Sequence, residues 1–302
     1  MRKVFIGFIL LISLAGIFVY QYARFYDDKF HLVFCDVGQG DAVFLRTPSG
    51  IDILIDGGPN DSILSCLERH MPFWDKTIEL AILTHPHEDH LNGFLDVLKN
   101  YKVLSFVTLD LKNNTSSFKA LLESLKEEKI NIRFVYLGDR FIFKDGLSIS
   151  IVGPSREFLA KTSPRGFIGE TNEFANVESL IKYKNFSALL TGDSQASELN
   201  EILKQVQDDI GISVLQVPHH GSRFGLTAEI LDILNPKAAA ISVGKNNKYG
   251  HPAQETLKIL GDKNIKILRT DQDGEIQITT DGSIFRLDIN SKMYHANFKA
   301  MN

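Results

Sequence analysis

The feature that most constrains this chain is an apolar run near its N-terminus, in which no charged residue occurs between Val4 and Tyr20. A helix of that length is roughly 26 Å long, which is enough for a somewhat thin hydrocarbon layer. A secretory signal peptide has a shorter apolar core and a small-x-small cleavage site. Here the run continues into FVYQY, and no clear A-x-A pattern follows. We expect residues 1–25 to be an uncleaved signal anchor, with a cleaved signal or a buried helix as the alternatives.

The charges around this run predict its orientation. Arg2 and Lys3 precede it, while Arg24 after it is offset by Asp27 and Asp28. The positive-inside rule then places the N-terminus in the cytoplasm and the rest of the chain outside. We therefore expect a single-pass protein of the cell membrane with an extracytoplasmic domain, or a secreted protein if the signal is cleaved.

The composition is that of a globular protein, with 44% hydrophobic and 23% charged residues among 302. A net charge of −4 argues against a strongly basic nucleic-acid coat protein. Cys35 and Cys66 are too few for a disulfide scaffold. Because Cys35 lies in the apolar stretch HLVFC and Cys66 in an expected helix, we expect two buried thiols.

From Phe30 onward the pattern changes to short apolar runs separated by glycine and aspartate, such as HLVFCDV, AVFLRT, IDILID and IELAILT. These runs read as strands. Helices are expected over residues 61–70, 89–101, 116–128, 196–206, 227–234 and 252–261. Two similar halves with no linker between them indicate one α/β sandwich over residues 30–290. The last residues, 291–302, show no periodicity and are expected to form a tail.

The stretch THPHEDHLNG, residues 84–93, crowds three histidines and two carboxylates together. His85 and His87 are two residues apart in an extended segment, so they project to the same side, and Asp89 begins the following helix with His90 beside it. This geometry delivers the first pair to one metal ion and the second pair to a neighbouring ion. Imidazoles and carboxylates are ligands of Zn²⁺, Mn²⁺ and Fe²⁺.

Further candidate residues follow other apolar strands. Asp193 ends SALLTGD, His219 and His220 follow SVLQVP, and His251 precedes a proline at the start of a helix. Each is weak evidence alone, since such residues are common in turns and caps. Together they place nearly every informative histidine at the carboxyl end of a buried strand. Three histidines lack this context and are expected to be structural or superficial: His31, His70 and His295.

HPHEDH resembles the H-x-H-x-D-H motif of the metallo-β-lactamase-fold hydrolases. More narrowly, FCDVGQGDAVFLRTPSGIDILIDGG, LLTGDS, VPHHGS and ISVGKNNKYGHP together resemble the hydrolase domain of ComEC-type DNA-uptake proteins, over about residues 30–290. The resemblance implies an α/β fold, a four-layer αβ/βα sandwich with a dinuclear metal site between its sheets.

The resemblance also implies a ligand set for two divalent ions, Zn or Mn. His85 and His87 would hold the first ion, Asp89 and His90 the second, and Asp193 would bridge both. The departure from many hydrolases of this fold is that no histidine occurs between His90 and Asp193. The first ion would then have fewer protein ligands, leaving room for water or a substrate oxygen.

One histidine of VPHHGS would complete the second ion's ligands, and we favour His219 over His220 while keeping both open. The other histidine would face the substrate, and His251 would contact a phosphate or donate a proton. The candidate catalytic residues are therefore Asp89, His220 and His251. Asp56 is expected to orient a ligand histidine by a hydrogen bond, or to be a plain turn residue.

The remaining candidates line the rim of the expected site. Asn176 and Ser179 lie in FANVESL, where many relatives of this fold carry the missing histidine. By itself, DVGQGD predicts a tight hairpin. The resemblance implies that this hairpin lies at the rim of the site. Its candidate residues are Asp36, Gln39 and Asp41. Four side chains in neighbouring loops could bind phosphates or simply be solvated: Arg223, Lys245, Lys248 and Tyr249.

Two metal ions suit in-line displacement at phosphorus, so no serine or cysteine nucleophile is required. The expected function is a metal-dependent phosphodiesterase or nuclease acting on extracellular DNA or RNA. The alternatives are hydrolysis of another extracellular ester, such as a phosphorylcholine ester or a lactone, and a non-catalytic DNA-uptake module. Expected partners are a nucleic acid or other phosphodiester, the membrane through the N-terminal helix, and, for any role in uptake, an unidentified channel protein.

Overall fold

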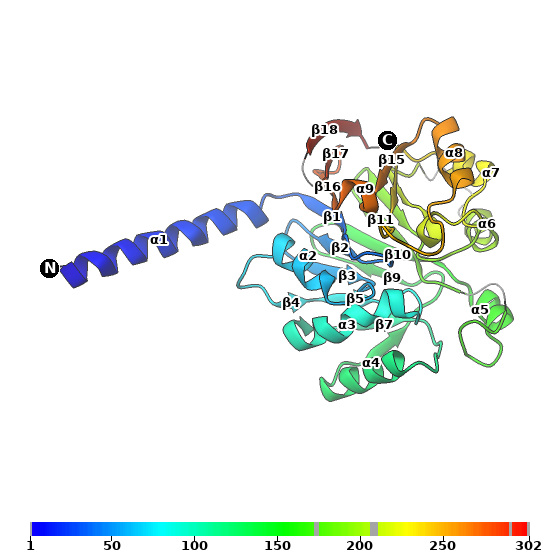
Figure 1. Cartoon of the computed structure of the whole chain (residues 1–302), viewed down its shortest axis with the longest axis horizontal. Coiled ribbons are helices and arrows are strands. Elements are labelled where there is room, and N and C mark those ends of the chain that lie inside the picture. The colour runs from blue at the N-terminus through cyan, green and yellow to red at the C-terminus, as the bar shows by residue number, and fades with distance from the viewer. Residues whose placement is uncertain (1, 172–174, 206–210, 290–291, 301–302) are drawn as a thin grey trace.

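The central strands of this chain are buried on both faces, and this explains the layers of the fold. Along β1 (Phe30–Phe34), Leu32 and Phe34 face one hydrophobic core, while Val33 and the following Cys35 face another. Successive side chains of a strand point to opposite faces, so such a strand must be covered on both sides. In the computed structural model, which describes residues 2–171, 175–205, 211–289 and 292–300, two β-sheets stack face to face and helices cover their outer faces (Figure 1).

The first sheet mixes antiparallel and parallel pairs. In spatial order, its described strands are β18 (Lys292–Lys299), β17 (Ile284–Ile289), β16 (Ile276–Thr280), β1, β2 (Val43–Arg46), β3 (Asp52–Ile55), β5 (Leu80–Ile82), β7 (Phe106–Thr108) and β8 (Ile132–Phe134). The pairs from β18 to β3 are antiparallel, and those from β3 to β8 are parallel. A short parallel pair lies beside this sheet, β4 (Thr77–Ile78) with β6 (Lys102–Val103).

The second sheet has the same mixed character. Its described strands are, in spatial order, β15 (Lys266–Arg269), β14 (Ala238–Ile241), β13 (Val214–Gln216), β12 (Phe186–Leu190), β11 (Glu178–Tyr183), β10 (Leu147–Gly153) and β9 (Arg140–Ile142). The pairs from β12 to β15 are parallel, and those from β9 to β12 are antiparallel.

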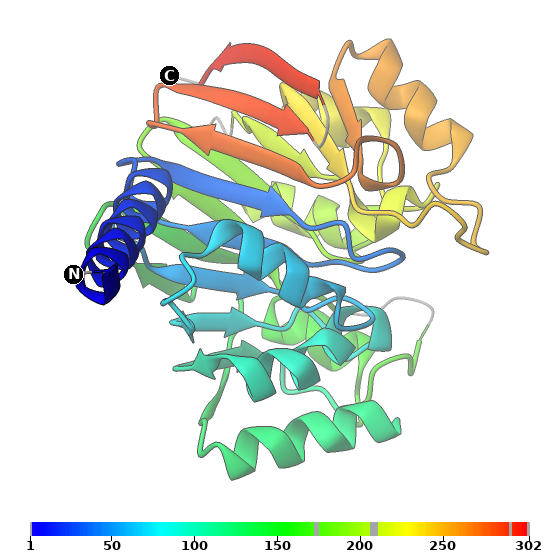
Figure 2. The same ribbon diagram turned by 60° about the vertical axis from the view of Figure 1, so that its left-hand side comes forward.

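Helices cover the outer face of each sheet (Figure 2). Those packed on the first sheet are α2 (Ser62–His70), α3 (Glu88–Asn100) and α4 (Ser116–Glu127). Those packed on the second are α6 (Ala196–Gln205), α7 (Ala228–Leu234) and α8 (Gln254–Asp262). These six confirm the expected helices to within one or two residues at each end. The short helices α5 (Arg156–Thr162) and α9 (Thr270–Asp273) and the 3₁₀ turn η1 (Pro218–Gly221) were not expected.

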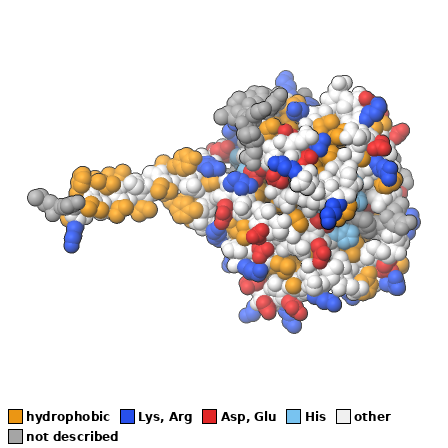
Figure 3. Space-filling model, viewed as in Figure 1, with side chains coloured by type: hydrophobic (Ala, Val, Ile, Leu, Met, Phe, Trp, Pro, Cys, Tyr) orange, Lys and Arg blue, Asp and Glu red, His pale blue; other side chains and the backbone are white. Residues whose placement is uncertain are grey.

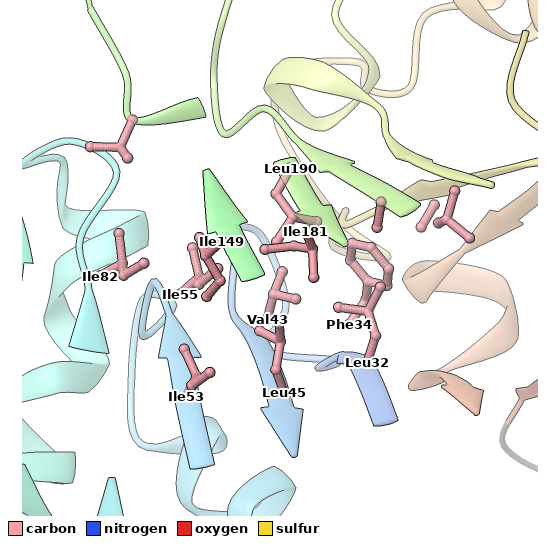
Figure 4. Packing of buried hydrophobic residues seen from close by; sticks show 14 of the residues in the cluster. Leu32, Phe34, Val43, Leu45, Ile53, Ile55, Ile82, Ile149, Ile181 and Leu190 are labelled. Carbon is pink, nitrogen blue, oxygen red and sulfur yellow. The ribbon is translucent and has the colours of Figure 1, made fainter. Parts of the chain in front are cut away.

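The inner core joins the two sheets. Figure 4 shows side chains of the first sheet, including Leu32, Phe34 and Val43, pointing toward Ile181 and Leu190 of the second. Every one of these side chains is buried. The architecture is therefore the expected α/β, four-layer αβ/βα sandwich, with the sheets in the middle and the helices outside.

The N-terminal apolar run forms the helix α1 (Arg2–Phe25), as expected. Within its segment Lys3–Phe25, an 18-residue stretch has a mean hydropathy of 2.3, and the segment is long and apolar enough to cross a membrane. Figure 3 shows it as an apolar projection from the domain. It contacts the domain near its end, where the rings of Phe18 and Trp74 stack with centroids 4.6 Å apart.

Two expectations about the chain are corrected. Cys35 and Cys66 are not free thiols but form a disulfide with Cα atoms 5.9 Å apart. Cys35 follows β1 and Cys66 lies on α2, which packs on the sheet, so the pairing depends on a tertiary contact that spacing alone does not reveal.

The end of the chain also differs from the expected tail. Residues Lys292–Lys299 form β18, which pairs antiparallel with β17. A strand at the edge of a sheet is held by main-chain hydrogen bonds to the neighbouring edge, and these require no side-chain periodicity. Residues 290, 291, 301 and 302 lie outside the described part of the chain.

Candidate metal centre

The candidate site lies where strands of both sheets end. The segment after β5 carries His85 and His87 and leads into α3, whose first turn contains Asp89 and His90. Asp193 lies three residues beyond the end of β12. The neighbouring parallel strand β13 leads directly to η1, which carries two histidines. Parallel neighbours end at the same edge of a sheet, so the Asp193 segment and η1 lie together. The distances from His85 and His90 to Asp193 bring the segment after β5 to the same place.

One group of potential ligands consists of Asp89, His90, Asp193 and His220. Nε2 of His90 lies 3.4 Å from Oδ1 of Asp193, and Nε2 of His220 lies 3.5 Å from the same oxygen. Oδ2 of Asp89 is 3.4 Å from Nε2 of His220. Four potential ligand atoms therefore face one small volume.

A second group shares Asp193 and adds His85 and His87. Nε2 of His85 is 3.9 Å from Oδ2 of Asp193, and it lies 2.9 Å from Nδ1 of His87. The two oxygens of Asp193 thus face different groups, which is the arrangement expected of a carboxylate shared by two ions.

Asp56 and Thr84 fix the orientation of two of these histidines. Nδ1 of His90 donates to Oδ2 of Asp56 at 2.8 Å, so its Nε2 faces the site. Asp56 also accepts from the main-chain N and the hydroxyl of Thr84, both at 2.8 Å. Because the Thr84 hydroxyl proton is given to Asp56, Nδ1 of His85 donates to Thr84 Oγ1 at 3.0 Å. Such hydrogen bonds set the tautomer and direction of a metal-binding imidazole.

His220 is oriented in the same way from the second sheet. Its Nδ1 donates to the carbonyl oxygen of Ser242 at 3.0 Å and lies 3.6 Å from Oδ1 of Asp41. Asp41 in turn accepts from Nε2 of Gln216 at 2.9 Å, and Oε1 of Gln216 accepts from the main-chain N of Thr191 at 3.0 Å. Gln216 therefore connects the DVGQGD loop to the loop that carries Asp193.

Burial and charge shift several pKa values in this group. Burial by itself lowers the pKa of His90, but the charges of Asp193 and Asp56 outweigh it and raise that pKa well above its ordinary value. Burial would raise the pKa of Asp193, but His220 and His90 hold it well below the usual range. His85 differs: burial, with the neighbouring His90, lowers its pKa well below the ordinary value. The site therefore favours an ionised Asp193 beside a neutral His85.

The donor set fits divalent metal ions. Nε2 of His90, Nε2 of His220 and Oδ1 of Asp193 are all buried and have no hydrogen-bond partner in the described structure. Buried polar atoms are normally paired, and unpaired ones that face each other call for an explanation. A shared cation satisfies all three at once, and mixed imidazole and carboxylate ligands suit Zn²⁺, Mn²⁺ or Fe²⁺.

The backbone around the two adjacent histidines is unusual. His219 has φ 50° and ψ 50°, and His220 has φ 55° and ψ 23°, so both adopt the left-handed region. Non-glycine residues held there cost on the order of 1–3 kcal/mol each and are enriched at functional sites. The main-chain N of His219 donates to the carbonyl oxygen of Gly192 at 3.0 Å, which ties the turn to the Asp193 loop. This conformation sends the two side chains in different directions.

His220, rather than the favoured His219, is the histidine of the four-residue group. His219 is 31% exposed, and its Nε2 lies 3.7 Å from Oδ2 of Asp193. The His251 ring lies beside it, with centroids 5.8 Å apart, and is also partly exposed. These two histidines thus line the open side of the site.

The rim candidates divide into those that reach the site and those that do not. The side-chain oxygen of Asn176 accepts from the main-chain N of Asp193 at 3.2 Å, and Oε1 of Gln39 accepts from the main-chain N of Gly244 at 3.1 Å. Ser179 points toward the core between the sheets with its hydroxyl buried. Asp36 is exposed, and no described hydrogen bond joins it to the ligand groups.

Two close approaches explain glycines around the site, Gly40 in the GQGD turn and Gly93 on α3. A Cβ on Gly40 would lie 2.2 Å from the carbonyl oxygen of Asp89, and a Cβ on Gly93 would lie 1.9 Å from that of Gly57. Both distances are far below van der Waals contact. The GQGD and DGG turns can therefore press against the start of α3 only because these positions lack a side chain.

The fold and this site together define the class of protein. The chain has the metallo-β-lactamase fold, a metallo-hydrolase fold, with two groups of potential metal ligands at the ends of its strands. It is similar to the metallo hydrolase Igni18 of Ignicoccus hospitalis, with a TM-score of 0.52, 14% identity, and coverage of 82% of this chain and 98% of the other. The metallo-β-lactamase fold protein YhfI of Bacillus subtilis gives a TM-score of 0.50 and 11% identity over 80% and 95% of the two chains. The diiron β-hydroxylase CmlA of Streptomyces venezuelae gives 0.52 and 15% over 84% and 54%.

Two curated sequence relatives are ComEC-type competence proteins, a narrower group than the fold neighbours. ComE operon protein 3 of Bacillus subtilis is 32% identical over 262 residues, which are 80% of this chain and 32% of the relative. Recombination protein 2 of Haemophilus influenzae is 25% identical over 247 residues, 80% of this chain and 28% of the relative. The chain therefore spans about a third of the length of these curated relatives. No family model matches it.

Proposed function

We propose that this protein is a metal-dependent phosphodiesterase that hydrolyses nucleic acid outside the cytoplasm. The observation that carries the proposal is the convergence of two ligand groups on the single carboxylate of Asp193. When two divalent ions are bound at such a site, they supply Lewis acidity and lower the pKa of a water molecule. The similarity to ComEC-type competence proteins supports nucleic acid as the substrate.

The roles of the chain's residues follow from their positions. His85, His87 and Asp193 would hold one ion, and Asp89, His90, His220 and Asp193 the other. His220 is therefore the proposed metal ligand and His219 the substrate-facing histidine, the reverse of the assignment favoured from the sequence. Asp56 and Asp41 orient the imidazoles, while His219 and His251, on the open side, are positioned to hydrogen-bond a phosphate or transfer a proton.

The proposed location is the outer face of the cell membrane, with α1 as the anchor. The apolar length of α1 and the basic residues before it support this topology. The Cys35–Cys66 disulfide supports it independently, because structural disulfides persist mainly in oxidising compartments outside the cytoplasm. In intact cells with any outer barrier opened, external protease should remove epitopes placed after residue 30. Protection equal to that of a cytosolic protein would overturn the topology.

The function is tested with the purified full chain in non-ionic detergent, supplied with Mn²⁺ or Zn²⁺. The substrates are single-stranded DNA, double-stranded DNA, RNA, a simple phosphodiester, a phosphorylcholine ester and a lactone. We expect hydrolysis of nucleic acid and of the simple diester, and its loss in Asp193→Ala, with an unchanged circular dichroism spectrum. Turnover of the lactone or phosphorylcholine ester alone, or DNA binding without turnover, would overturn the proposal.

A further inference from the structure

A row of aromatic rings leads outward from the candidate metal centre. The His219 ring, whose Nε2 is 3.7 Å from Asp193, is followed by that of His251 at 5.8 Å between centroids. The ring of Tyr249 comes next, 6.1 Å from His251 and nearly parallel to it, at 15° between planes. Tyr249 is 71% exposed, so it is the outermost ring of the row and is open to solvent.

The loop that carries Tyr249 is held by the side chain of Asn247. Its Oδ1 accepts from the main-chain N of Tyr249 at 3.2 Å and of His251 at 3.0 Å. Its Nδ2 donates to the carbonyl oxygens of Gly244 at 3.0 Å and His251 at 2.7 Å. Four hydrogen bonds from one side chain fix the loop, so the exposed ring is presented in a set position rather than left on a free loop.

The same loop is docked on the rim of the site. The main-chain N of Gly244 donates to Oε1 of Gln39, and a Cβ on Gly244 would lie 2.7 Å from the main-chain N of Gln39. This contact joins the Tyr249 loop to the DVGQGD loop, which also supplies Asp41 to the site. Lys245 and Lys248 on this loop are exposed, so positive charge accompanies the ring.

We propose that Tyr249 is a base-binding residue: its exposed face stacks on a nucleobase adjacent to the phosphodiester held at the metal centre. This inference rests on the proposed function. An exposed aromatic ring beside cations is the usual platform for an unpaired base, because every base offers a π-face. The bases of a duplex already stack on both sides, so the platform accepts a single strand or a frayed end.

The test compares Tyr249→Ala, Tyr249→Phe and a matched control, Phe134→Ala, in the full chain in detergent. Phe134 is also exposed, but it lies on β8 at the edge of the first sheet, whereas the Tyr249 loop follows β14 of the second. The substrates are a thymidine oligomer, the same oligomer with one abasic residue at successive positions, and a simple phosphodiester without a base. Melting temperatures confirm that the variants fold.

We expect Tyr249→Ala to raise KM for the oligomer roughly 5- to 150-fold, with little change in kcat, and to hydrolyse the simple diester at the wild-type rate. Tyr249→Phe and Phe134→Ala should retain wild-type KM. An abasic residue at one position should raise KM for the wild type and leave Tyr249→Ala unaffected. Equal KM for Tyr249→Ala and wild type, or equal abasic effects in both, would overturn the inference. A wild type that neither binds nor cleaves any oligomer would overturn the proposed function itself, and this inference with it.

Discussion

Glu178→Gln should abolish a specific pH dependence of stability. Glu178 is buried at the start of β11, where its Oε1 lies 2.6 Å from Oγ of Ser194. The same hydroxyl lies 2.7 Å from the carbonyl oxygen of Thr191. One hydroxyl proton cannot serve both acceptors, so a protonated Glu178 that donates to Ser194 satisfies the whole arrangement. Burial raises the pKa of Glu178 to about 8, and the hydrogen bond that the ionised carboxylate would accept from Ser194 lowers it too little to offset burial.

The sign and size of the effect follow from this pKa. Below the ordinary value of 4.5 the carboxyl is protonated in both the folded and the unfolded state. As the pH rises toward about 8, the unfolded chain loses the proton while the folded protein keeps it, so the free energy of unfolding falls. The full loss is about 5 kcal/mol, at about 1.4 kcal/mol for each unit between the two pKa values. A glutamine at position 178 does not ionise, and its side-chain amide can still donate to Ser194.

The assay is urea denaturation of the full chain in non-ionic detergent with a chelator, followed by circular dichroism at pH 5 and pH 9. We expect Glu178→Gln to exceed the wild type by less than about 1 kcal/mol at pH 5 and by up to about 5 kcal/mol at pH 9. Glu128→Gln, at an exposed position, is the matched control and should show no such change. Glu178 lines a small cavity together with Glu198 and Glu201, and these two residues are unchanged in every variant. A difference between Glu178→Gln and wild type that is the same at both pH values would refute the reasoning.

Three further predictions test the site and its scaffold. His220→Ala should lose bound metal, whereas His219→Ala should keep it and hydrolyse substrate about 10²–10⁴-fold more slowly than the wild type. If metal analysis shows the reverse, His219 is the ligand. Asp56→Asn should lower metal affinity about 10–100-fold, because the Asp56 carboxylate orients the imidazole of His90. An unchanged affinity in a Zn²⁺ titration would contradict this role. Cys35→Ser should lower the free energy of unfolding by about 3–4 kcal/mol, as reductant should in the wild type, because the disulfide with Cys66 closes a loop of 31 residues. Equal stability with and without reductant would contradict it.

The sequence predicted the parts of the site that are local. HPHEDH is a strand end followed by a helix start, so the spacing of its residues already determines which side chains lie together. Asp193 was recognisable because it follows a buried strand through a glycine. A single α/β sandwich was also predictable, since apolar patterns are set strand by strand, whereas its four-layer order was implied by the family resemblance.

What the sequence did not reveal depends on tertiary contacts and backbone conformation. His219 and His220 are adjacent and chemically identical, and only their left-handed backbone decides which one enters the four-residue group. Predicting the Cys35–Cys66 disulfide would have required knowing that α2 packs on the first sheet. Gln216 was missed although it carried a signal, a polar residue inside the buried apolar run VLQV.

The most direct test of a dinuclear hydrolytic centre is a metal titration of the chelator-treated full chain, with bound ions and phosphodiester hydrolysis measured in the same samples. We expect two ions to bind per chain and the hydrolysis rate to rise with their binding. Asp193→Ala should bind fewer ions and show no turnover. Full hydrolysis by the metal-free chain, or an Asp193→Ala variant that binds two ions and turns over normally, would contradict the assignment of this site.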